Sequence, residues 1–324
     1  MKAIDAYYML KPLIPRPVQV FLRRAAVRRK RERVADIWPI DRACATPPPG
    51  WGGWPEGKKF ALVLTHDVEG PAGKEKCLDL MRMETAMGFR SSFNFVPEGY
   101  EVSPAIRETL GINGFEVGVH GLTHDGKLYS SRKSFEAKAK KINEYLEQWG
   151  ASGFRSPAMH HDLEWIHEFN IEYDASTFDT DPFEPQSDGH GTIFPFLVGG
   201  DGGKRGYVEL PYTLPQDFLL FVLLRERWID IWKRKLDWIA ESGGMALLIT
   251  HPDYMNFGHG APGNEEYPAA YYRGFLSYLQ TRYRGKYWAA LPREMARFWR
   301  ENVAREIPWA AYGTGSGKSA EEVR

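Results

Sequence analysis

Short apolar segments alternate with longer amphipathic stretches through most of the chain, from residue 60 to residue 302. An apolar run bounded by turn residues is typical of a buried strand, whereas apolar residues spaced by three or four are typical of a helix. This pattern predicts strands at residues 60–65, 91–96, 115–120, 154–156, 172–177, 207–211, 245–250 and 287–291. It predicts helices at residues 74–87, 104–110, 134–149, 163–169, 227–241, 271–283 and 292–302.

Strands that alternate with helices pair in parallel and are joined by right-handed crossovers. Seven or eight such units in about 245 residues suit a closed or nearly closed (β/α) barrel. The alternative is a doubly wound open sheet, but no glycine fingerprint follows the first strand. We therefore expect an α/β protein with a (β/α)7–8 barrel.

The barrel is expected at residues 59–304, and the composition changes on either side of it. Residues 1–58 form a basic arm that ends in a linker, because residues 45–55 carry four prolines and three glycines. Residues 305–324 form a flexible tail. The tail contains GTGSGKS, which imitates a phosphate-binding loop, but Tyr312 stands where that motif needs its first glycine.

Charge is uneven along the chain, although the formal net charge is zero. Residues 1–35 carry ten Lys or Arg against Asp5 and Glu32, a net charge of +8. Residues 16–35 are therefore either a basic helix packed on the body or a site of attachment to an anionic membrane surface or a partner, and we favour the packed helix. The neutral chain as a whole gives no indication of nucleic-acid binding.

Two cysteines, Cys44 and Cys77, are too few for a disulfide framework and are typical of a reducing compartment. The N-terminus lacks the apolar core and cleavage site of a signal peptide, and no apolar stretch is long enough to span a membrane. We expect a cytoplasmic protein, or one peripheral to the inner membrane if residues 16–35 bind lipid. The sequence carries no signal of an oligomeric state.

The first candidate site residues are two histidines within residues 117–125, which read VGVHGLTHD. In an extended chain the imidazoles of His120 and His124 would lie about 13 Å apart. A turn at Gly121, which accepts backbone angles that other residues resist, lets both rings reach one metal ion at about 2.0–2.1 Å. A histidine pair in a loop is usually solvated or packed, so this interpretation depends on other residues that converge on the same place.

Ionisable residues follow apolar strands repeatedly. The first strand ends in THDVE, with Asp67 and Glu69, and the third ends at His120. Arg155 opens the segment RSP after a fourth strand, and His251 follows a late strand in LLITHPD. Asp67 alone could be a helix cap, Arg155 an ion-pair partner and His251 a satisfied strand-end residue. Chemistry in such barrels lies at the carboxyl ends of the strands, so the residues together predict one site.

The order Thr-x-Asp, His-x-x-x-His, Arg-x-Pro and Leu-x-Ile-x-His resembles the polysaccharide deacetylase family, known as the NodB-homology family or carbohydrate esterase family 4. The resemblance covers roughly residues 58–300 and leaves the N-terminal arm outside it. It implies a distorted (β/α) barrel that binds one divalent metal ion, usually Zn²⁺, and removes acetyl groups from N-acetylated sugars.

The resemblance also implies a role for each residue of the predicted site. Asp67 matches the general base, Arg155 the arginine that orients it, and His251 the general acid. His120 and His124 match the metal-binding pair.

One departure from the family pattern concerns the first motif. Many members carry two adjacent aspartates there, the second a metal ligand, whereas this chain has Asp67 and Glu69 separated by a valine. Strand positions two apart share a face, so both carboxylates can point into the site. A branch with Asp-Val-Asp or Asp-Val-Glu is closer to this chain. By that analogy Glu69 is the third metal ligand, although the reverse assignment stays open.

Two further motifs differ from the family. Ala158 and Met159 follow Pro157 where an aromatic residue and a glycine are usual. The aspartate that pairs with the acidic histidine is also not readable from the sequence. The candidates for it are Asp174, Asp179 and Asp217.

The leading functional hypothesis is a metal-dependent hydrolase of C–N bonds other than peptide bonds, with an N-acetylated sugar or glycan as its substrate. One alternative is a hydrolase of a cyclic amide or ureide on the same barrel, and another is a non-catalytic glycan-binding relative.

Residues 178–206 form a long Gly-, Pro- and Asp-rich loop, which we expect to be irregular and to form a wall of the cleft. Its candidate sugar-binding residues are Phe183, Phe194, Phe196, Asp179, Asp181 and Asp188.

Overall fold

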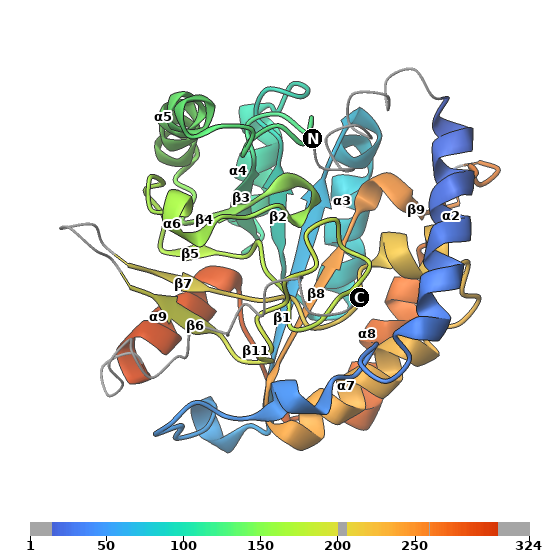
Figure 1. Cartoon of the computed structure of the whole chain (residues 1–324). Helices are drawn as coiled ribbons and strands as arrows, with labels where there is room; N and C mark the ends of the chain where they lie inside the picture. Colours follow the sequence, from blue (N-terminus) through green and yellow to red (C-terminus); the bar gives the residue numbers. More distant parts are fainter. Residues whose placement is uncertain (1–14, 200–205, 259, 304–324) are drawn as a thin grey trace, which may run out of the picture.

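The computed structural model of the protein describes residues 15–199, 206–258 and 260–303. A curled sheet forms its centre, and helices cover the outside (Figure 1). The strands are β1 Phe60–Val68, β2 Ser92–Phe95, β3 Glu116–His120, β4 Gly153–Arg155, β5 Tyr173–Asp174, β6 Phe196–Val198, β7 Tyr207–Glu209, β8 Met245–Thr250, β9 Met255–Asn256, β10 Tyr267–Pro268 and β11 Tyr287–Ala289.

Eight α-helices are described, and several shorter turns of helix connect the strands. The α-helices are α2 Arg16–Arg33, α3 Pro71–Ala86, α4 Pro104–Ile112, α5 Arg132–Trp149, α6 Leu163–Ile166, α7 Asp230–Ser242, α8 Ala270–Arg282 and α9 Pro292–Asn302. The shorter elements are η2 Arg42–Ala45, η3 Pro55–Gly57, η4 Pro157–Met159, the π-helix η5 Phe218–Leu223 and η6 Pro252–Tyr254.

Local sequence explains where individual elements begin and end. Helix α5 begins after Ser131, whose side chain accepts a hydrogen bond from the backbone N–H of Ser134. It ends at Gly150, which adopts the left-handed conformation with φ 61°. The nine residues of β1 are all buried, which explains why its first five residues form a continuous apolar run rather than an alternating pattern.

Strand β1 is the centre of the barrel. Strand β8 pairs with it on one side, and β2 and β11 share its other side. The sheet continues in parallel from β2 through β3, β4 and β5 to β7. After β7, an isolated β-bridge pairs Tyr212 with Phe178, and a second pairs Leu214 with Leu248 of β8. These two bridges connect the end of the sheet to β8. The predicted (β/α) barrel is therefore confirmed, as a distorted ring of short strands.

The sequence pattern missed several elements after β5. Strand β6 lies within residues 178–206, which we expected to be irregular, and it pairs antiparallel with β7. The π-helix η5 reads FLLFVL, and five of its six residues are buried. An uninterrupted apolar run has no amphipathic period, so nothing in it distinguishes a buried helix from a buried strand.

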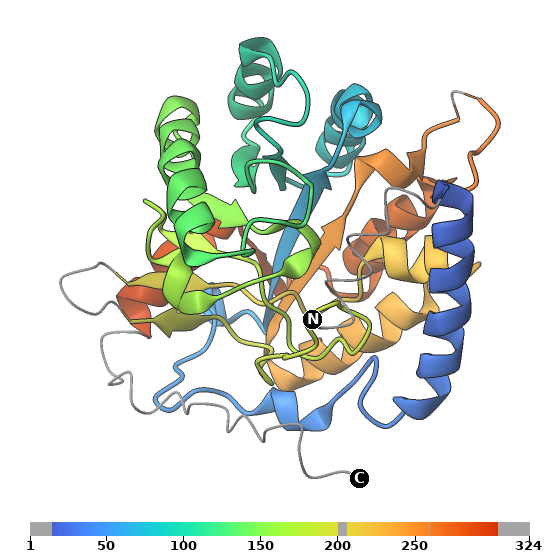
Figure 2. The ribbon, with the colours of Figure 1, turned by 45° about the horizontal axis from the view of Figure 1, so that its top comes forward.

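The basic segment of the N-terminal arm is helix α2, which lies along one side of the barrel (Figures 1 and 2). Its inner face buries Val20 and Val27. The guanidinium of Arg24 donates a hydrogen bond of 2.9 Å to the carbonyl oxygen of Val222 in η5. The arm is thus a basic helix packed on the body.

The stretch that we predict to be a linker also packs on the barrel. The rings of Trp51 and Trp54 contact those of Phe194 and Trp299. The indole N–H of Trp54 donates a hydrogen bond of 2.7 Å to the carbonyl oxygen of Gly243. The predicted tail at residues 305–324, with its GTGSGKS segment, lies outside the described residues.

Both cysteines are free thiols in the protein interior. Burial raises the pKa of Cys44 to about 12, so this thiol is protonated at neutral pH. None of the described helices is long and apolar enough to cross a membrane.

Candidate active site

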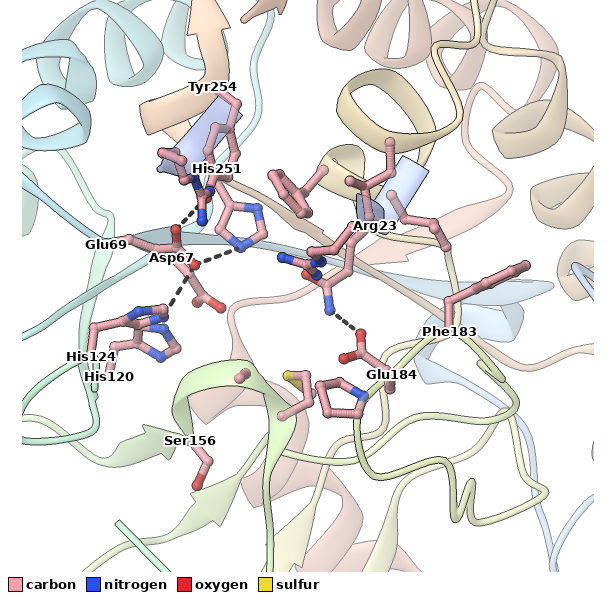
Figure 3. Close-up of a pocket in the computed structure, with 18 residues that line it drawn as sticks. Arg23, Asp67, Glu69, His120, His124, Ser156, Phe183, Glu184, His251 and Tyr254 are labelled. Carbon is pink, nitrogen blue, oxygen red and sulfur yellow. Dashed lines mark hydrogen bonds and ion pairs between the residues drawn. The ribbon is translucent and has the colours of Figure 1, made fainter. Parts of the chain in front are cut away.

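The predicted site residues lie where parallel strands end, at one end of the barrel. Asp67 belongs to β1, and Glu69 directly follows that strand. His120 ends β3, Arg155 ends β4 and His251 directly follows β8. Figure 3 shows Asp67, Glu69, His120 and His251 around one pocket. The barrel therefore brings together residues that are far apart in the sequence.

Asp67 is held by two hydrogen-bond donors. Arg155 Nη1 lies 3.1 Å from Asp67 Oδ1, and Asn94 Nδ2 donates to the same oxygen at 2.9 Å. Arg155 is itself fixed, because its Nε donates to the carbonyl oxygen of Ala175 at 2.8 Å. Burial alone raises the pKa of Asp67, but the charge of Arg155 and smaller contributions outweigh burial and leave that pKa below its ordinary value. Asp67 is therefore a carboxylate at neutral pH.

Glu69, His120 and His124 form a cluster in which one ligand atom from each lies within 4.8 Å of the others. Glu69 Oε1 lies 3.1 Å from His124 Nε2. The turn expected at Gly121 is present with φ +67°, and a Cβ there would lie 2.5 Å from Pro157 Cγ. Glycine is needed at this turn, because a side chain would combine backbone strain with a clash.

The donors of this cluster fit a divalent cation such as Zn²⁺. His120 Nδ1 lies 3.1 Å from the carbonyl oxygen of Arg155, which can only accept, so Nδ1 carries the proton and Nε2 keeps a lone pair. Burial lowers the pKa of His120 to about 4, which keeps this imidazole neutral. Two imidazoles and one carboxylate would leave positions open for water and substrate, as in catalytic zinc sites.

His251 is held by Asp217, one of the three aspartates that the sequence left open. Asp217 Oδ1 lies 2.6 Å from His251 Nδ1, and Asp217 Oδ2 accepts a hydrogen bond of 2.8 Å from the backbone N–H of His251. Burial alone lowers the pKa of His251, but the negative charge of Asp217, with smaller contributions from other carboxylates, raises it to about 10. His251 is thus protonated, and its Nε2 lies 3.9 Å from Glu69 Oε1.

The other two aspartates have different partners. Ser176 donates its hydroxyl to Asp174 Oδ1 at 2.8 Å. Asp179 Oδ2 lies 2.6 Å from the ammonium of Lys235, with both side chains buried. Neither carboxylate is placed to orient His251.

A cavity of about 350 Å³ opens onto these groups. The candidate metal cluster, Asp67, His251 and Tyr254 line one half of it. Helix α2, the loop before β6 and the η5 region line the other half, with the residues Arg16, Arg23, Phe183, Glu184, Pro185, Gln216, Phe218, Leu219 and Leu223. Arg23 and Glu184 point towards each other at this second half (Figure 3).

The shape of the barrel is similar to three solved structures across nearly their whole length. One is a protein from Mycobacterium smegmatis assigned as a polysaccharide deacetylase, with 19% sequence identity, a TM-score of 0.60, and coverage of 81% of this chain and 96% of that one. A second such protein, from Pseudomonas aeruginosa, has 17% identity, a TM-score of 0.61 and coverage of 82% and 99%. The chain has the polysaccharide deacetylase fold.

An allantoinase shares this fold to the same degree, with 15% identity, a TM-score of 0.60, and coverage of 82% of this chain and 98% of that one. No family model and no curated protein matches the sequence itself. At such low identity the similarities concern the arrangement of the chain and leave the substrate open.

Within the deacetylase fold, the structure adds residues that the sequence pattern did not reveal. The hydroxyl of Tyr254 donates to Glu69 Oε2, and the backbone N–H of Glu69 donates to Asp253 Oδ2 at 2.9 Å. Tyr267 donates its hydroxyl to Asp217 at 2.8 Å. Asn94 pairs with Asp67 across neighbouring strands. Its signal in the sequence was a single amide between Phe93 and Phe95.

Part of the long loop lies on the pocket at the expected end of the barrel. Three of its residues line the cavity: Phe183, Glu184 and Pro185. The sugar-binding role predicted for four other residues of this loop was wrong, because their side chains are buried. Asp179 and Asp181 are 2% exposed, and Phe194 and Phe196 are also buried. An irregular loop has no period from which inward and outward side chains can be told apart.

The unusual residues of the Arg-x-Pro motif also line the cavity. Ala158 and Met159 have φ 54° and 52°, so the backbone turns sharply after Pro157. Both border the pocket, where they place small and flexible apolar side chains.

Proposed function

We propose that the protein is a metal-dependent hydrolase that removes the N-acetyl group from an amino sugar in a polysaccharide or glycan precursor. The observation that carries the proposal is the juxtaposition of three groups at one pocket. They are the Glu69, His120 and His124 cluster, the carboxylate Asp67 beside Arg155, and the protonated His251 beside Asp217. The deacetylase fold supports this assignment.

The side chains supply the proton transfers that amide hydrolysis needs. A zinc ion held by Glu69, His120 and His124 would lower the pKa of water and polarise the carbonyl group. Asp67, oriented by Arg155, accepts the proton of the attacking water. His251, kept protonated by Asp217, donates a proton to the departing amine.

The second half of the pocket supports a sugar as the substrate. Phe183 and Phe218 offer apolar faces for a pyranose ring, while Arg23 and Gln216 offer donors for its hydroxyl oxygens. Burial and the neighbouring Asp181 raise the pKa of Glu184 to about 8, so this side chain is largely protonated at neutral pH and can donate as well as accept.

Metal content and acetate release together test the proposal. The purified protein should hold one divalent ion per chain and release acetate from oligomers of an N-acetylated amino sugar. The double variant His120→Ala, His124→Ala should lose both the ion and the activity while it stays folded. His167→Ala is the matched control, because His167 packs against Tyr207 and does not line the pocket. Wild-type protein without a bound ion would contradict the metal site.

The similarity to an allantoinase favours one second candidate, a hydrolase that opens a cyclic amide or ureide. This candidate would use the same metal ligands and the same acid and base. Ring opening without acetate release would separate it from deacetylation. A purely glycan-binding role needs neither a base nor an acid. The placement of Asp67 beside Arg155 and of His251 beside Asp217 therefore argues against it.

A further inference from the structure

The outer face of α2 exposes large apolar side chains. Val18, Phe21 and Leu22 are 46%, 68% and 53% exposed, and they make up half of the six large apolar side chains exposed among the described residues. Their spacing of three and four places them on one side of the helix. Val20 and Val27, which face the barrel, lie on the opposite side.

Exposed arginines continue the same face towards the end of the helix. Arg28 and Arg29 are exposed and lie about two turns after Phe21 and Leu22. Arginines on the inner side of the helix instead form ion pairs with glutamates of the barrel. Arg16 binds Glu265 at 2.7 Å, and Arg31 binds Glu226 at 2.5 Å.

Helix α2 is strongly basic as a whole, with eight Lys or Arg residues against the single acid Glu32. Bulky apolar side chains beside cations suit the boundary between lipid headgroups and acyl chains, where the apolar groups insert and arginines meet lipid phosphates. The helix lies at the outer edge of the molecule in both Figures 1 and 2, where its outer face is open to a surface.

We propose that the α2 outer surface (Val18, Phe21, Leu22, Arg28 and Arg29) docks the protein on an anionic lipid bilayer. The opposite side of the same helix supplies Arg16 and Arg23 to the pocket. Docking therefore holds the pocket close to the bilayer surface, where it can receive a substrate that is displayed there. This consequence rests on the proposed function, whereas the docking itself does not.

Sedimentation of the full chain with lipid vesicles tests the docking. The vesicles contain phosphatidylcholine alone, or phosphatidylcholine with about a third of phosphatidylglycerol. The protein should bind the anionic vesicles and not the neutral ones, and binding should fall steeply between about 0.1 M and about 0.5 M salt. The apolar variant Phe21→Ser, Leu22→Ser and the charge variant Arg28→Ser, Arg29→Ser should each bind about tenfold or more weakly.

The matched control is Ile112→Ser on α4, because Ile112 is 86% exposed and lies outside the α2 outer surface. This variant should bind vesicles like the wild type. All variants should keep the wild-type unfolding temperature and the wild-type metal content, because the exposed residues support neither the core nor the metal cluster.

Three results would overturn the proposal. They are no binding of the wild type to anionic vesicles, equal binding by the apolar variant, and equal loss of binding in Ile112→Ser. Self-association of the wild type that disappears in the apolar variant, without vesicle binding, would assign the surface to a second copy of the chain. Because vesicle binding is measured without turnover, failure of the docking and failure of the deacetylase assignment are distinguishable.

Discussion

At the scale of single residues, each acid–base group of the site is held by a partner of opposite charge. Arg155 Nη1 lies 3.1 Å from Asp67, and Asp217 lies 2.6 Å from His251. Each partner fixes both the direction and the protonation state of the side chain. Asp67 is a carboxylate and His251 an imidazolium, which are the states that a base and an acid need before turnover.

The variant Asp67→Asn tests the division of roles between the two carboxylates after β1. The amide has the shape of the carboxylate but cannot take a proton from water, so kcat should fall by roughly 10²–10⁴. Metal content should stay near normal, because Glu69 supplies the third ligand. Steady-state acetate release and metal analysis of the same protein sample measure both effects.

The control for this variant is Asp125→Asn, since Asp125 is exposed and directly follows His124. It should leave turnover and metal content unchanged. If Asp67→Asn emerges without metal, Asp67 is a ligand and its assigned role belongs to Glu69.

At the scale of elements, the turn after β3 decides whether the two histidines meet. The strand directs His120 towards the pocket, and the backbone must then reverse within four residues to bring His124 beside it. The ring centres of the two histidines lie 5.3 Å apart, far closer than an extended chain would allow. The positive φ at Gly121 makes this reversal possible.

The variant Gly121→Ala should therefore weaken both folding and metal binding. Strain at positive φ together with the contact to Pro157 should lower the free energy of unfolding by roughly 1–3 kcal/mol. Metal affinity should fall about tenfold or more, because the two imidazoles separate. Denaturant titration and competition with a metal chelator measure the two effects.

Gly88→Ala is the matched control for backbone strain. Gly88 has φ +73°, but a Cβ there would have no atom within 4 Å. It should cost some stability and leave metal affinity unchanged. Equal loss of metal affinity in both variants would show that the turn at Gly121 does not position the histidines.

Local sequence predicted the elements best where one pattern repeats or a strong boundary occurs. Strand β8 and helix α9 have the expected bounds, because an apolar run in β8 and a proline at the start of α9 mark them. Strand β1 extends three residues beyond its predicted end and includes Asp67. A buried polar residue ends an apolar run in the sequence, but in the barrel it continues the strand, since Arg155 and Asn94 satisfy it.

At the scale of the whole molecule, burial of several acids makes stability depend on pH. Glu116 lies in β3, where it accepts hydrogen bonds from the hydroxyl of Tyr173 at 2.8 Å and from the backbone N–H of Arg293 at 3.1 Å. Burial nevertheless raises the pKa of Glu116 from 4.5 to about 7. The folded protein thus keeps this proton at a pH where the unfolded chain has released it.

The sign of the pH effect follows from this difference. The contribution of Glu116 to stability is fully present below its unfolded pKa of 4.5 and is lost as pH rises through its folded pKa of about 7. In Glu116→Gln, the fall of the unfolding temperature between about pH 5 and about pH 8 should be smaller than in the wild type. The exposed Glu108→Gln on α4 should follow the wild-type curve. A Glu116→Gln curve parallel to that of the wild type would contradict the raised pKa.

The sequence by itself determined the barrel and the strand ends at which several candidate site residues lie. Strand–helix alternation is local information, and so is the placement of Glu69, His120 and His251 at or directly after strand ends. Parallel strands then bring those ends together whatever the remaining details. The glycine between the two histidines was also readable, because a turn depends on the residues within it.

Tertiary structure alone decided which residues from segments without a sequence pattern reach the site. Asp217 lies 34 residues before His251 and directly precedes η5. The position of η5 places Asp217, rather than either of the other two candidate aspartates, beside His251. Nothing in the sequence predicts that position, because η5 has no periodic pattern. Helix α2 supplies Arg23 to the pocket, although the N-terminal arm lies outside the resemblance that identified the site. Both outcomes depend on how segments without a pattern of their own pack on the barrel, and that packing is set by the shape and charge of the completed core.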